Sequence, residues 1–581
     1  MPHPPADSSW FTFDSPAHPG LRVYAFSGTE EIHKPYEFEI ELVAESPEVD
    51  FSELMGRPAC LCVADKSGGV RHVHGLIRHF RQLHTANLRT HYRCVLVPRL
   101  WFLSLVTDHR IFQNMTVLQI IEQILKEQNF TGDSYAFKCF YDYPPRDYCV
   151  QYGETALHFI SRLCEEEGVY YYFEHRQDGH VLCFSDREGG PPIPGESRLL
   201  FHPGAGTETD TATVRKAELS QAIGSDAVTF SDWNFEKTRL DLQIGQAETD
   251  PIKAPVPVGM ALEQYRFPHL YQLRKDGDRY AGIELLRLFS LSRRIDATTD
   301  VSRMSPGHAF ELRKHHRPDL NGRWWVVRVE HRGEQPQVLE HEAPDRGMSY
   351  AADVQAIPNA TRFVPASRHR RNRVLGEQTA IVTGPEGEEI FPDRYGRVKV
   401  QFHWDRLGGH DENTTCWIRV SQGWAGGQYG TMAIPRIGQE VVVSFLEGDP
   451  DRPIITGRVY NAANPVPYLL PAHKTRTVFK SLSTPGGGGF NELRIEDRKG
   501  QEEIYAHAEK DVNVYVKNDW KERILHDQHR TIDNFSYSLV KGEDQQTVHK
   551  DRKVELLTDD HLTVRGSSHT HVQEKWLVRA G

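Results

Sequence analysis

Long hydrophobic runs are missing from this 581-residue chain, so no membrane-spanning helix is predicted. Its first residues, MPHPPADSSWFTFDSP, lack a basic region followed by an apolar one, so no signal peptide is predicted either. The chain also lacks an excess of positive charge: 80 acidic residues face 69 Lys and Arg, and the net charge of −11 argues against nucleic acid as the main partner. With 38% hydrophobic and 26% charged residues, the composition is typical of a globular chain of roughly three or four domains.

The chain also lacks the common signatures of metal binding, disulfide chemistry and catalysis. None of its eight cysteines forms a CxxC pair. Cys60 and Cys62 alternate on one face of a predicted strand, and the cysteines as a group are interpreted as small buried hydrophobic residues in a reducing cytosol. The 30 histidines show no second ligand pair at a metal-binding spacing, and GxSxG, HExxH and P-loop motifs are absent. No catalytic residue, cofactor or metal ligand is therefore predicted.

Residues 1–356 have the pattern of a mixed region of strands and helices. Thr116 and Gln119 have the spacing of a capping box, which predicts a helix over 116–128. Two more helices are predicted over 155–167 and around 277–294. Further predicted elements are strands at 36–46 and 91–100 and a hairpin of 169–175 with 181–186. The run Glu165, Glu166, Glu167 at a helix end is interpreted as a solvated face.

The next stretch changes character several times. Residues 357–376 are rich in proline and arginine and are predicted to be a solvated linker. Residues 377–465 contain short alternating strands with frequent glycines, which predict a small Greek-key barrel of the OB type. Residues 466–510 form a connector and a hairpin. Because the barrel aromatics are not interleaved with a basic stripe, buried packing or subunit contact is favoured for them over nucleic-acid binding. These aromatics are Phe402, Trp404, Trp417 and Trp424.

Residues 511–581 carry one apolar residue at every eighth position, and we call these residues the anchors. The anchors are Val516, Ile524, Ile532, Val540, Val548, Leu556, Val564 and Val572. The second residue after an anchor is often one that tolerates a tight corner, as at Asn518, Asn534, Gly542 and Gly566. Such a repeat predicts a short strand followed by a corner.

One anchor per octad is too little apolar surface for a core within a single chain. Two arrangements remain: three octads of one chain could close into a 24-residue coil, or three chains could each supply one face of a prism. The second arrangement is preferred, because each octad then adds about 4.8 Å to a rigid trimeric rod with the anchors on its axis.

Several long stretches carry a resemblance to a known family. They include GPEGEEIFPDRYGRVKVQFHWDR at 384–406, the stretch 416–468, and GGGGFNELRIEDRKGQEEIYAHAEKDV at 486–512. These stretches, with 110–125 and 148–175, resemble VgrG, the spike family of type VI secretion systems, over nearly the whole chain. The family is similar to the fused hub and needle proteins of contractile phage tails. The resemblance implies a mainly β, multidomain chain with some α+β. Residues 1–356 would form a hub with two barrel-like domains, residues 377–465 an OB-fold, and residues 511–581 an intertwined trimeric β-helix.

The resemblance also implies a mechanical function and a set of partners. A homotrimeric spike would sit at the front of a tube of Hcp rings, carry effector proteins and a PAAR-type tip protein, and cross a target membrane. Such a protein would be made in the bacterial cytoplasm, exported by type VI secretion, and would not be an enzyme. Three alternatives stay open: a hub or spike of a phage tail or bacteriocin, an effector hydrolase, and a nucleic-acid-binding OB protein. The octads reach Gly581 in register, so a shaft without its tip is expected.

Overall fold

The computed structural model describes residues 9–66, 68–86, 89–204, 212–250, 257, 260–269, 271–339 and 347–579. The chain divides into two units, Met1–His507 and Ala508–Gly581. Within the described residues, no helix is both long and apolar enough to cross a membrane.

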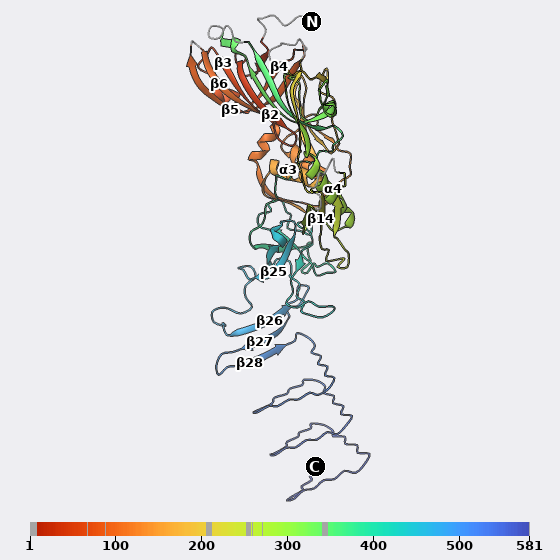
Figure 1. Ribbon diagram of the computed structural model, residues 1–581. Helices are drawn as coiled ribbons and strands as arrows, with labels where there is room; N and C mark the ends of the chain where they lie inside the picture. The colour runs from red at the N-terminus through yellow and green to blue at the C-terminus, as the bar shows by residue number, and fades with distance from the viewer. Residues whose placement is uncertain are drawn as a thin grey trace. The chain divides into compact units, whose positions relative to one another are not determined.

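A twelve-stranded sheet is the largest element of the first unit. Ten of its strands follow the order β1-β4-β5-β6-β3-β2-β19-β20-β17-β13, and β18 joins β12 to β19. The strands are β1 (Phe11–Asp14), β2 (Arg22–Glu31), β3 (Glu37–Ala44), β4 (Pro58–Ala64), β5 (Val70–Ala86), β6 (Arg89–Val97), β12 (Arg198–Leu200), β13 (Val214–Gln221), β17 (Arg293–Thr299), β18 (Ala309–Arg313), β19 (Gly322–Glu334) and β20 (Ser349–Pro358). Figure 1 shows β5, β6, β3 and β2 as neighbouring strands of one curved sheet.

Alternation of apolar and polar residues explains why these segments are strands. In β3, the side chains of Phe38, Ile40 and Leu42 are buried in the hub core, while Glu37 and Glu39 are exposed between them. Successive side chains of a strand point to opposite faces, so this pattern buries one face of the sheet and leaves the other to solvent. The strands predicted at 36–46 and 91–100 are confirmed as β3 and β6.

Among the described residues, four α-helices accompany the sheet: α1 (Phe51–Leu54), α2 (Val117–Glu127), α3 (Ala156–Glu167) and α4 (Arg274–Phe289). The predicted capping box is present at α2, where Thr116 and Gln119 each bond the other's backbone N–H. Helix α3 ends at Gly168, which adopts a left-handed conformation with φ of 71°. Helix α4 ends before the predicted residue 294, because the chain turns after Phe289 and enters β17 at Arg293.

Smaller sheets surround the helices. The predicted hairpin of 169–175 with 181–186 is confirmed as β10 and β11, and β8 pairs with β11 on its other edge. This sheet contains β8 (Tyr135–Lys138), β10 (Tyr170–His175) and β11 (His180–Ser185). A two-stranded sheet contains β7 (Thr107–Phe112) and β9 (Cys149–Thr155). A third sheet contains β14 (Ala227–Phe230), β15 (Ile244–Ala247) and β16 (Glu263–Arg266). Short 3-10 helices are η1 (Arg99–Leu105), η2 (Pro318–Leu320), η3 (Pro336–Leu339) and η4 (Leu446–Gly448).

A five-stranded sheet forms the small barrel, with the order β22-β21-β24-β25-β23. Its strands are β21 (Gln378–Thr383), β22 (Lys399–Phe402), β23 (Arg419–Val420), β24 (Glu440–Phe445) and β25 (Pro453–Val459). Their alternating residues, such as Val400, Phe402, Val441 and Val443, form a separate core. A last sheet contains β26 (Arg476–Leu482), β27 (Phe490–Glu496) and β28 (Glu503–His507), so the predicted hairpin has a third strand.

The second unit has neither helix nor strand between residues 508 and 579. Instead, the chain is extended and bends at regular intervals. Figure 1 shows this unit as an open coil, in which successive turns stand apart from one another.

Candidate functional site

The bends of the open coil recur every eight residues. They lie at 509–510, 517–518, 525–526, 533–534, 541–542, 549–550, 557–558, 565–566 and 573–574. Each anchor from Val516 to Val572 directly precedes a bend, and the second residue of the bend is the position predicted for the corner. None of the residues predicted for this position, Asn518, Asn534, Gly542 and Gly566, has a positive φ, so the bends do not use the left-handed backbone that the sequence reasoning expected.

The anchors are the most shielded large apolar side chains of the coil, although they are far from buried. In the single chain their exposed fractions lie between 43% and 54%, whereas the other large apolar side chains of residues 508–579 are 59% to 90% exposed. The anchors therefore share the inner side of the coil, and about half of each side chain remains uncovered. Burying a residual apolar surface of this kind against other chains is favourable by roughly 25 cal/mol per Å².

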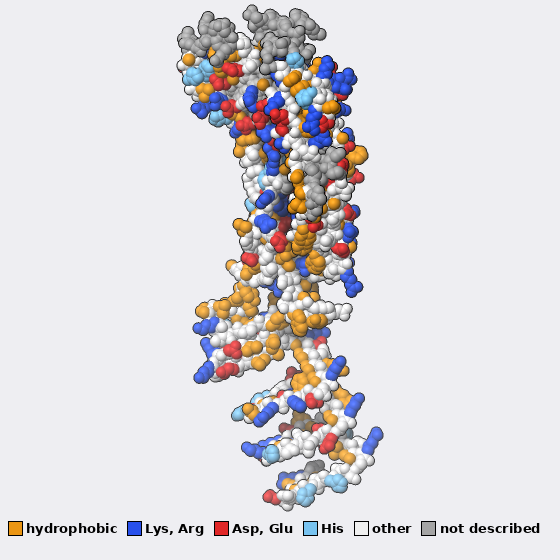
Figure 2. Space-filling model, in the orientation of Figure 1, with side chains coloured by type: hydrophobic (Ala, Val, Ile, Leu, Met, Phe, Trp, Pro, Cys, Tyr) orange, Lys and Arg blue, Asp and Glu red, His pale blue; other side chains and the backbone are white. Residues whose placement is uncertain are grey.

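The backbone of the coil lacks hydrogen-bond partners between its turns, just as the anchors lack full apolar cover. Between residues 510 and 579, the described backbone forms no strand ladder and no backbone hydrogen bond from one turn to the next. The space-filling view in Figure 2 shows open space between successive turns. The chain thus winds about an axis instead of following one face, and it does not close by itself. Extended backbone requires hydrogen-bond partners, which strands of other chains can supply between the turns.

A second feature is a buried ionic cluster at the C-terminal end of α3. Glu165 and Glu167 are each only 2% exposed at the side chain, and Glu166 is 26% exposed. Arg146 binds Glu166 at 2.6 Å and Glu167 at 2.7 Å. Arg162 binds Glu166 at 2.9 Å from one turn earlier on the helix. The interpretation of these glutamates as a solvated face is wrong, because histidines pair with Glu165 and arginines pair with Glu166 and Glu167.

Arg371 connects this cluster to the small barrel. Its guanidinium lies 3.0 Å from Glu166 of α3 and 2.9 Å from Asp449, and it also bonds Asp451 in the turn before β25. Asp451 in turn accepts a hydrogen bond from the backbone N–H of Val150 in β9, at 2.7 Å. We call these residues, with Arg146 and Arg162, the ionic junction. One guanidinium thereby joins three carboxylates from the hub and the barrel.

The segment that supplies Arg371 differs from its prediction. Phe363 and Val364 are buried, and the ring Nδ1 of His369 lies 2.7 Å from Glu165. The Ser290 hydroxyl at the end of α4 donates to the carbonyl of Val364 at 3.2 Å. The predicted solvated linker is therefore packed against the hub over part of its length, because its apolar and basic residues find partners there.

Burial and ion pairing oppose each other in the ionic junction. Burial alone would raise the pKa of Glu166, but the charges of Arg371, Arg146 and Arg162 outweigh it and hold that pKa well below its usual value. For Asp451, burial is the larger effect and raises its pKa to about 6 despite Arg371. These carboxylates are occupied by guanidinium groups, so the geometry suits a rigid joint between hub and barrel better than proton transfer.

His331 of β19 makes the hub sensitive to acid. Burial, followed by the charge of Arg71, lowers its pKa to about 4, against the opposing bond to Glu30. Unfolding restores a pKa near 6.5, so the unfolded state binds the proton first and stability is lost as pH falls from about 6.5 towards 4. We expect this group alone to cost about 2 kcal/mol between pH 7.5 and pH 5. The unfolding free energy at both pH values, compared between the native chain and His331→Gln, measures the effect. An unchanged pH dependence in the variant would contradict it.

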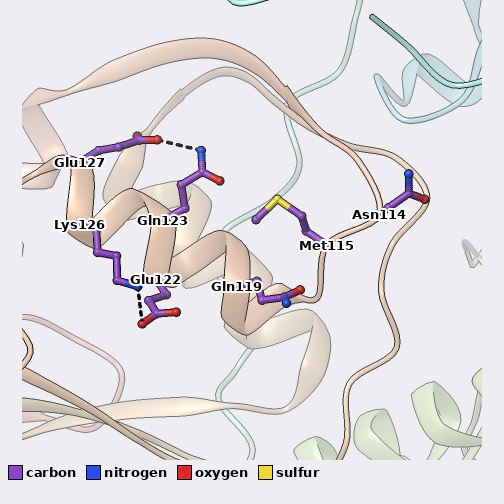
Figure 3. Close-up of a pocket in the computed structure, with 7 residues that line it drawn as sticks. All are labelled: Asn114, Met115, Gln119, Glu122, Gln123, Lys126 and Glu127. Carbon is purple, nitrogen blue, oxygen red and sulfur yellow. Dashed lines mark hydrogen bonds and ion pairs between the residues drawn. The ribbon is translucent and has the colours of Figure 1, made fainter. Parts of the chain in front are cut away.

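One shallow pocket lies on the exposed side of α2, outside the features above. Figure 3 shows that its polar side chains pair with each other along the helix. Glu122 binds Lys126 at 2.9 Å, and Gln123 donates to Glu127 at 2.9 Å. Such pairs one turn apart are typical of a solvated helix face.

The barrel aromatics divide between core and surface. Phe402 is buried, and Trp404 stacks on it with ring centroids 5.1 Å apart. Trp417 is 5.1 Å from Phe391, while Trp424 is 62% exposed. Phe402 and Trp404 thus pack with the barrel core, as sequence reasoning favoured, whereas Trp417 is half-buried outside that core.

Comparison with known protein families divides the chain into three matched parts. Residues 29–337 match the phage tail baseplate hub family, and residues 380–460 match the injector OB domain of type VI secretion systems and phage baseplates. Residues 477–581 match the C-terminal trimerisation domain of bacteriophage T4 gp5. The prediction of a mainly β, multidomain chain with a phage-hub-like region and an OB-fold is therefore confirmed, and the predicted trimeric β-helix corresponds to the match with the gp5 trimerisation domain.

Relatives support the same assignment. The type VI secretion system spike protein VgrG4b of Pseudomonas aeruginosa is 44% identical over 90% of this chain and 65% of its own length. VgrG1a of the same organism is 36% identical over 98% of this chain and 86% of its own length. The actin cross-linking toxin VgrG1 of Vibrio cholerae is 37% identical, with 87% of this chain and 46% of its own length covered. The chain thus spans about two thirds or less of the length of VgrG4b and of the toxin.

Among solved structures, a similar fold is found in the E. coli c3393 protein, described as a type VI secretion component with structural similarity to T4 gp27 and gp5. The TM-score is 0.55 at 22% identity, with 76% of this chain and 97% of that chain covered. This match shows the same fold, and the relatives show that the chain belongs to the VgrG family of type VI secretion system spike proteins.

Proposed function

We propose that this chain is a structural spike that works as a homotrimer and is not itself an enzyme. The carrying observation is the open coil: its anchors are half exposed and its turns are unbonded in the single chain. Two further copies would supply strands between the turns and apolar side chains on the axis. The match of residues 477–581 to a trimerisation domain supports the same assembly.

The proposed role of the trimer is to transmit force. A rod of hydrogen-bonded strands from three intertwined chains has few free edges and lacks a single hinge. The ionic junction would hold the barrel on the hub when the rod is loaded along its axis. In this proposal the hub sits on an Hcp ring of the tube, a PAAR-type protein binds the needle end, and effector proteins travel with the spike into a target cell. The spike would leave the cytoplasm through the type VI machine itself.

The proposal that the chain is not an enzyme rests on how much of it the family matches cover. The hub, OB and trimerisation matches cover residues 29–337, 380–460 and 477–581. A catalytic domain needs at least roughly 50 residues, more than the segments between these matches provide. A hydrolase or nuclease assay on the purified chain checks this assignment, and activity abolished by a point substitution would contradict it.

Val540→Asp tests the proposed function as a whole. In the trimer, the change places three carboxylates near a dry axis, at a cost of several kcal/mol. The native chain should scatter light with three times the 66.5 kDa mass of one chain, and the variant with less. In a bacterium that carries the variant as its only copy, secretion of the tube protein into the medium should fall to background. A native monomer with an intact far-UV spectrum, or undiminished secretion by the variant, would sink the proposal.

A further inference from the structure

Two cysteines and two histidines face each other on adjacent strands of the hub sheet. Strands β4 and β5 pair antiparallel, and the register places Cys60 opposite His74 and Cys62 opposite His72. Alternate residues of a strand point to the same face, so the four side chains project from one side of the sheet. The alternating residues Leu61 and Val63 take the other side and belong to the hub core.

The ligand-type atoms of these side chains lie close together. The two sulfurs, Cys60 Sγ and Cys62 Sγ, are 3.7 Å apart. Nδ1 of His72 lies 3.4 Å from Cys62 Sγ and 3.9 Å from Cys60 Sγ. Nε2 of His74 lies 3.8 Å from Cys60 Sγ. In Cys60, Cys62 and His72, the three atoms all lie within 4.8 Å of one another.

These separations are those of the edges of a coordination tetrahedron. With zinc–sulfur bonds of about 2.3 Å and zinc–nitrogen bonds of about 2.0 Å, tetrahedral geometry separates two sulfurs by about 3.8 Å and a sulfur from a nitrogen by about 3.5 Å. The sulfur pair and the contacts to His72 match these values within a few tenths of an ångström. The strand pairing therefore holds the donors at a suitable spacing without any rearrangement of the backbone.

We propose that Cys60, Cys62 and His72 bind a zinc ion, with His74 as the fourth ligand. Thiolate and imidazole together favour zinc over the hard cations magnesium and calcium, which prefer oxygen ligands. Nε2 of His74 lies 3.0 Å from the carbonyl of Arg176, in the turn between β10 and β11. His74 must exchange this contact for the metal, so the fourth position is the adjustable one.

The surroundings suit a structural role for the ion. Strand β1 pairs with β4 on its other edge and brings Thr12 opposite Cys62 and Asp14 opposite Cys60. Cys60 is buried, while Cys62, His72 and His74 are half-buried, so an ion can enter from solvent. Bound there, zinc would lock β4 to β5 near the edge of the sheet and protect both thiols from oxidation. This inference does not depend on the proposed spike function.

The test is metal binding by the full chain, purified under reducing conditions and stripped with a chelator. We expect native protein to bind one more equivalent of Zn²⁺ than Cys62→Ser, and to bind it about 100-fold or more tightly than His72→Gln. Cobalt added in place of zinc should give the visible bands of tetrahedral Co²⁺ together with thiolate absorption in the near ultraviolet. Both signals should vanish in Cys62→Ser and in His72→Gln, and persist in Cys416→Ser, a control cysteine in the barrel. His74→Gln should keep the thiolate band and weaken binding less.

Three results would overturn the proposal. The first is equal zinc stoichiometry and cobalt spectra in the native chain, Cys62→Ser and His72→Gln, with far-UV spectra showing that all three fold. The second is a native chain that binds no zinc above the level of the Cys62→Ser variant. The third is a Cys60–Cys62 disulfide that forms in zinc-saturated, reducing buffer, detected by mass spectrometry as the loss of two hydrogens. A thermal midpoint that rises with zinc in the native chain and not in the variants would support it.

Discussion

Leu556→Asp is expected to dissociate the trimer, whereas the same substitution at the next residue, Leu557→Asp, is expected to leave it intact. Leu556 is an anchor, and Leu557 begins the following bend. In the single chain Leu556 is 54% exposed and Leu557 is 90% exposed, so the first faces the inside of the coil and the second faces away. An aspartate at the first position would bring three like charges to the axis, at a cost of roughly 3 kcal/mol or more per chain.

The two variants make a matched pair, because residue type, charge and local sequence are the same. Light scattering across a dilution series, with far-UV circular dichroism for folding, measures the outcome. Loss of the trimer in both variants would mean that the segment tolerates no charge at all. Retention in both would show that the anchors do not meet on an axis. Only loss confined to Leu556→Asp fits the model of three wound chains.

Arg371→Met is expected to loosen the attachment of the barrel to the hub. The substitution keeps most of the side-chain volume but leaves Glu166, Asp449 and Asp451 without their shared guanidinium. Breaking a buried ion pair by removing one partner costs about 3 to 5 kcal/mol. The population in which residues 357–376 detach should therefore rise about 100-fold or more, since each 1.4 kcal/mol is a factor of ten. The rate of limited proteolysis within that segment reports this population.

The control is the preceding residue, since Arg370 is exposed. Arg370→Met removes the same charge from the same segment and should leave the cleavage rate near that of the native chain. Equal cleavage rates in Arg371→Met and Arg370→Met would mean that the ionic junction does not hold the barrel to the hub. A large rise confined to Arg371→Met would identify the junction as the joint between hub and barrel.

Local signals in the sequence were sufficient for the helices that they mark. The capping box at Thr116 and the glycine at 168 bound α2 and α3 within one residue of the structure, because both motifs act through hydrogen bonds inside one turn. The end of α4 carries no such motif. It is set by the packing of Ser290 against the segment at Val364, and the sequence prediction overran it.

Charge patterns were less informative than local motifs. Three consecutive glutamates at a helix end have the sequence of a solvated face, and a run of arginines has that of a solvated linker. Each pattern is the partner of the other in the fold, where Glu166 meets Arg371 over more than 200 positions of sequence. The opposite charges of the two runs were a signal that they could pair. Using that signal required knowledge of which distant segments meet.

The eight-residue spacing can be recognised without the tertiary structure, because every octad repeats the same pattern of residues. It was enough to infer a repetitive shaft and the side chains on its inner line. The winding of one chain about the axis, and the open turns that leave room for others, emerged only in three dimensions. The same division applies to the hub: Cys-x-Cys and His-x-His are visible at residues 60–62 and 72–74, yet only the antiparallel register of β4 and β5 brings them together. Sequence neighbours interact through local backbone geometry, whereas distant segments meet only where burial of the whole core decides the pairing.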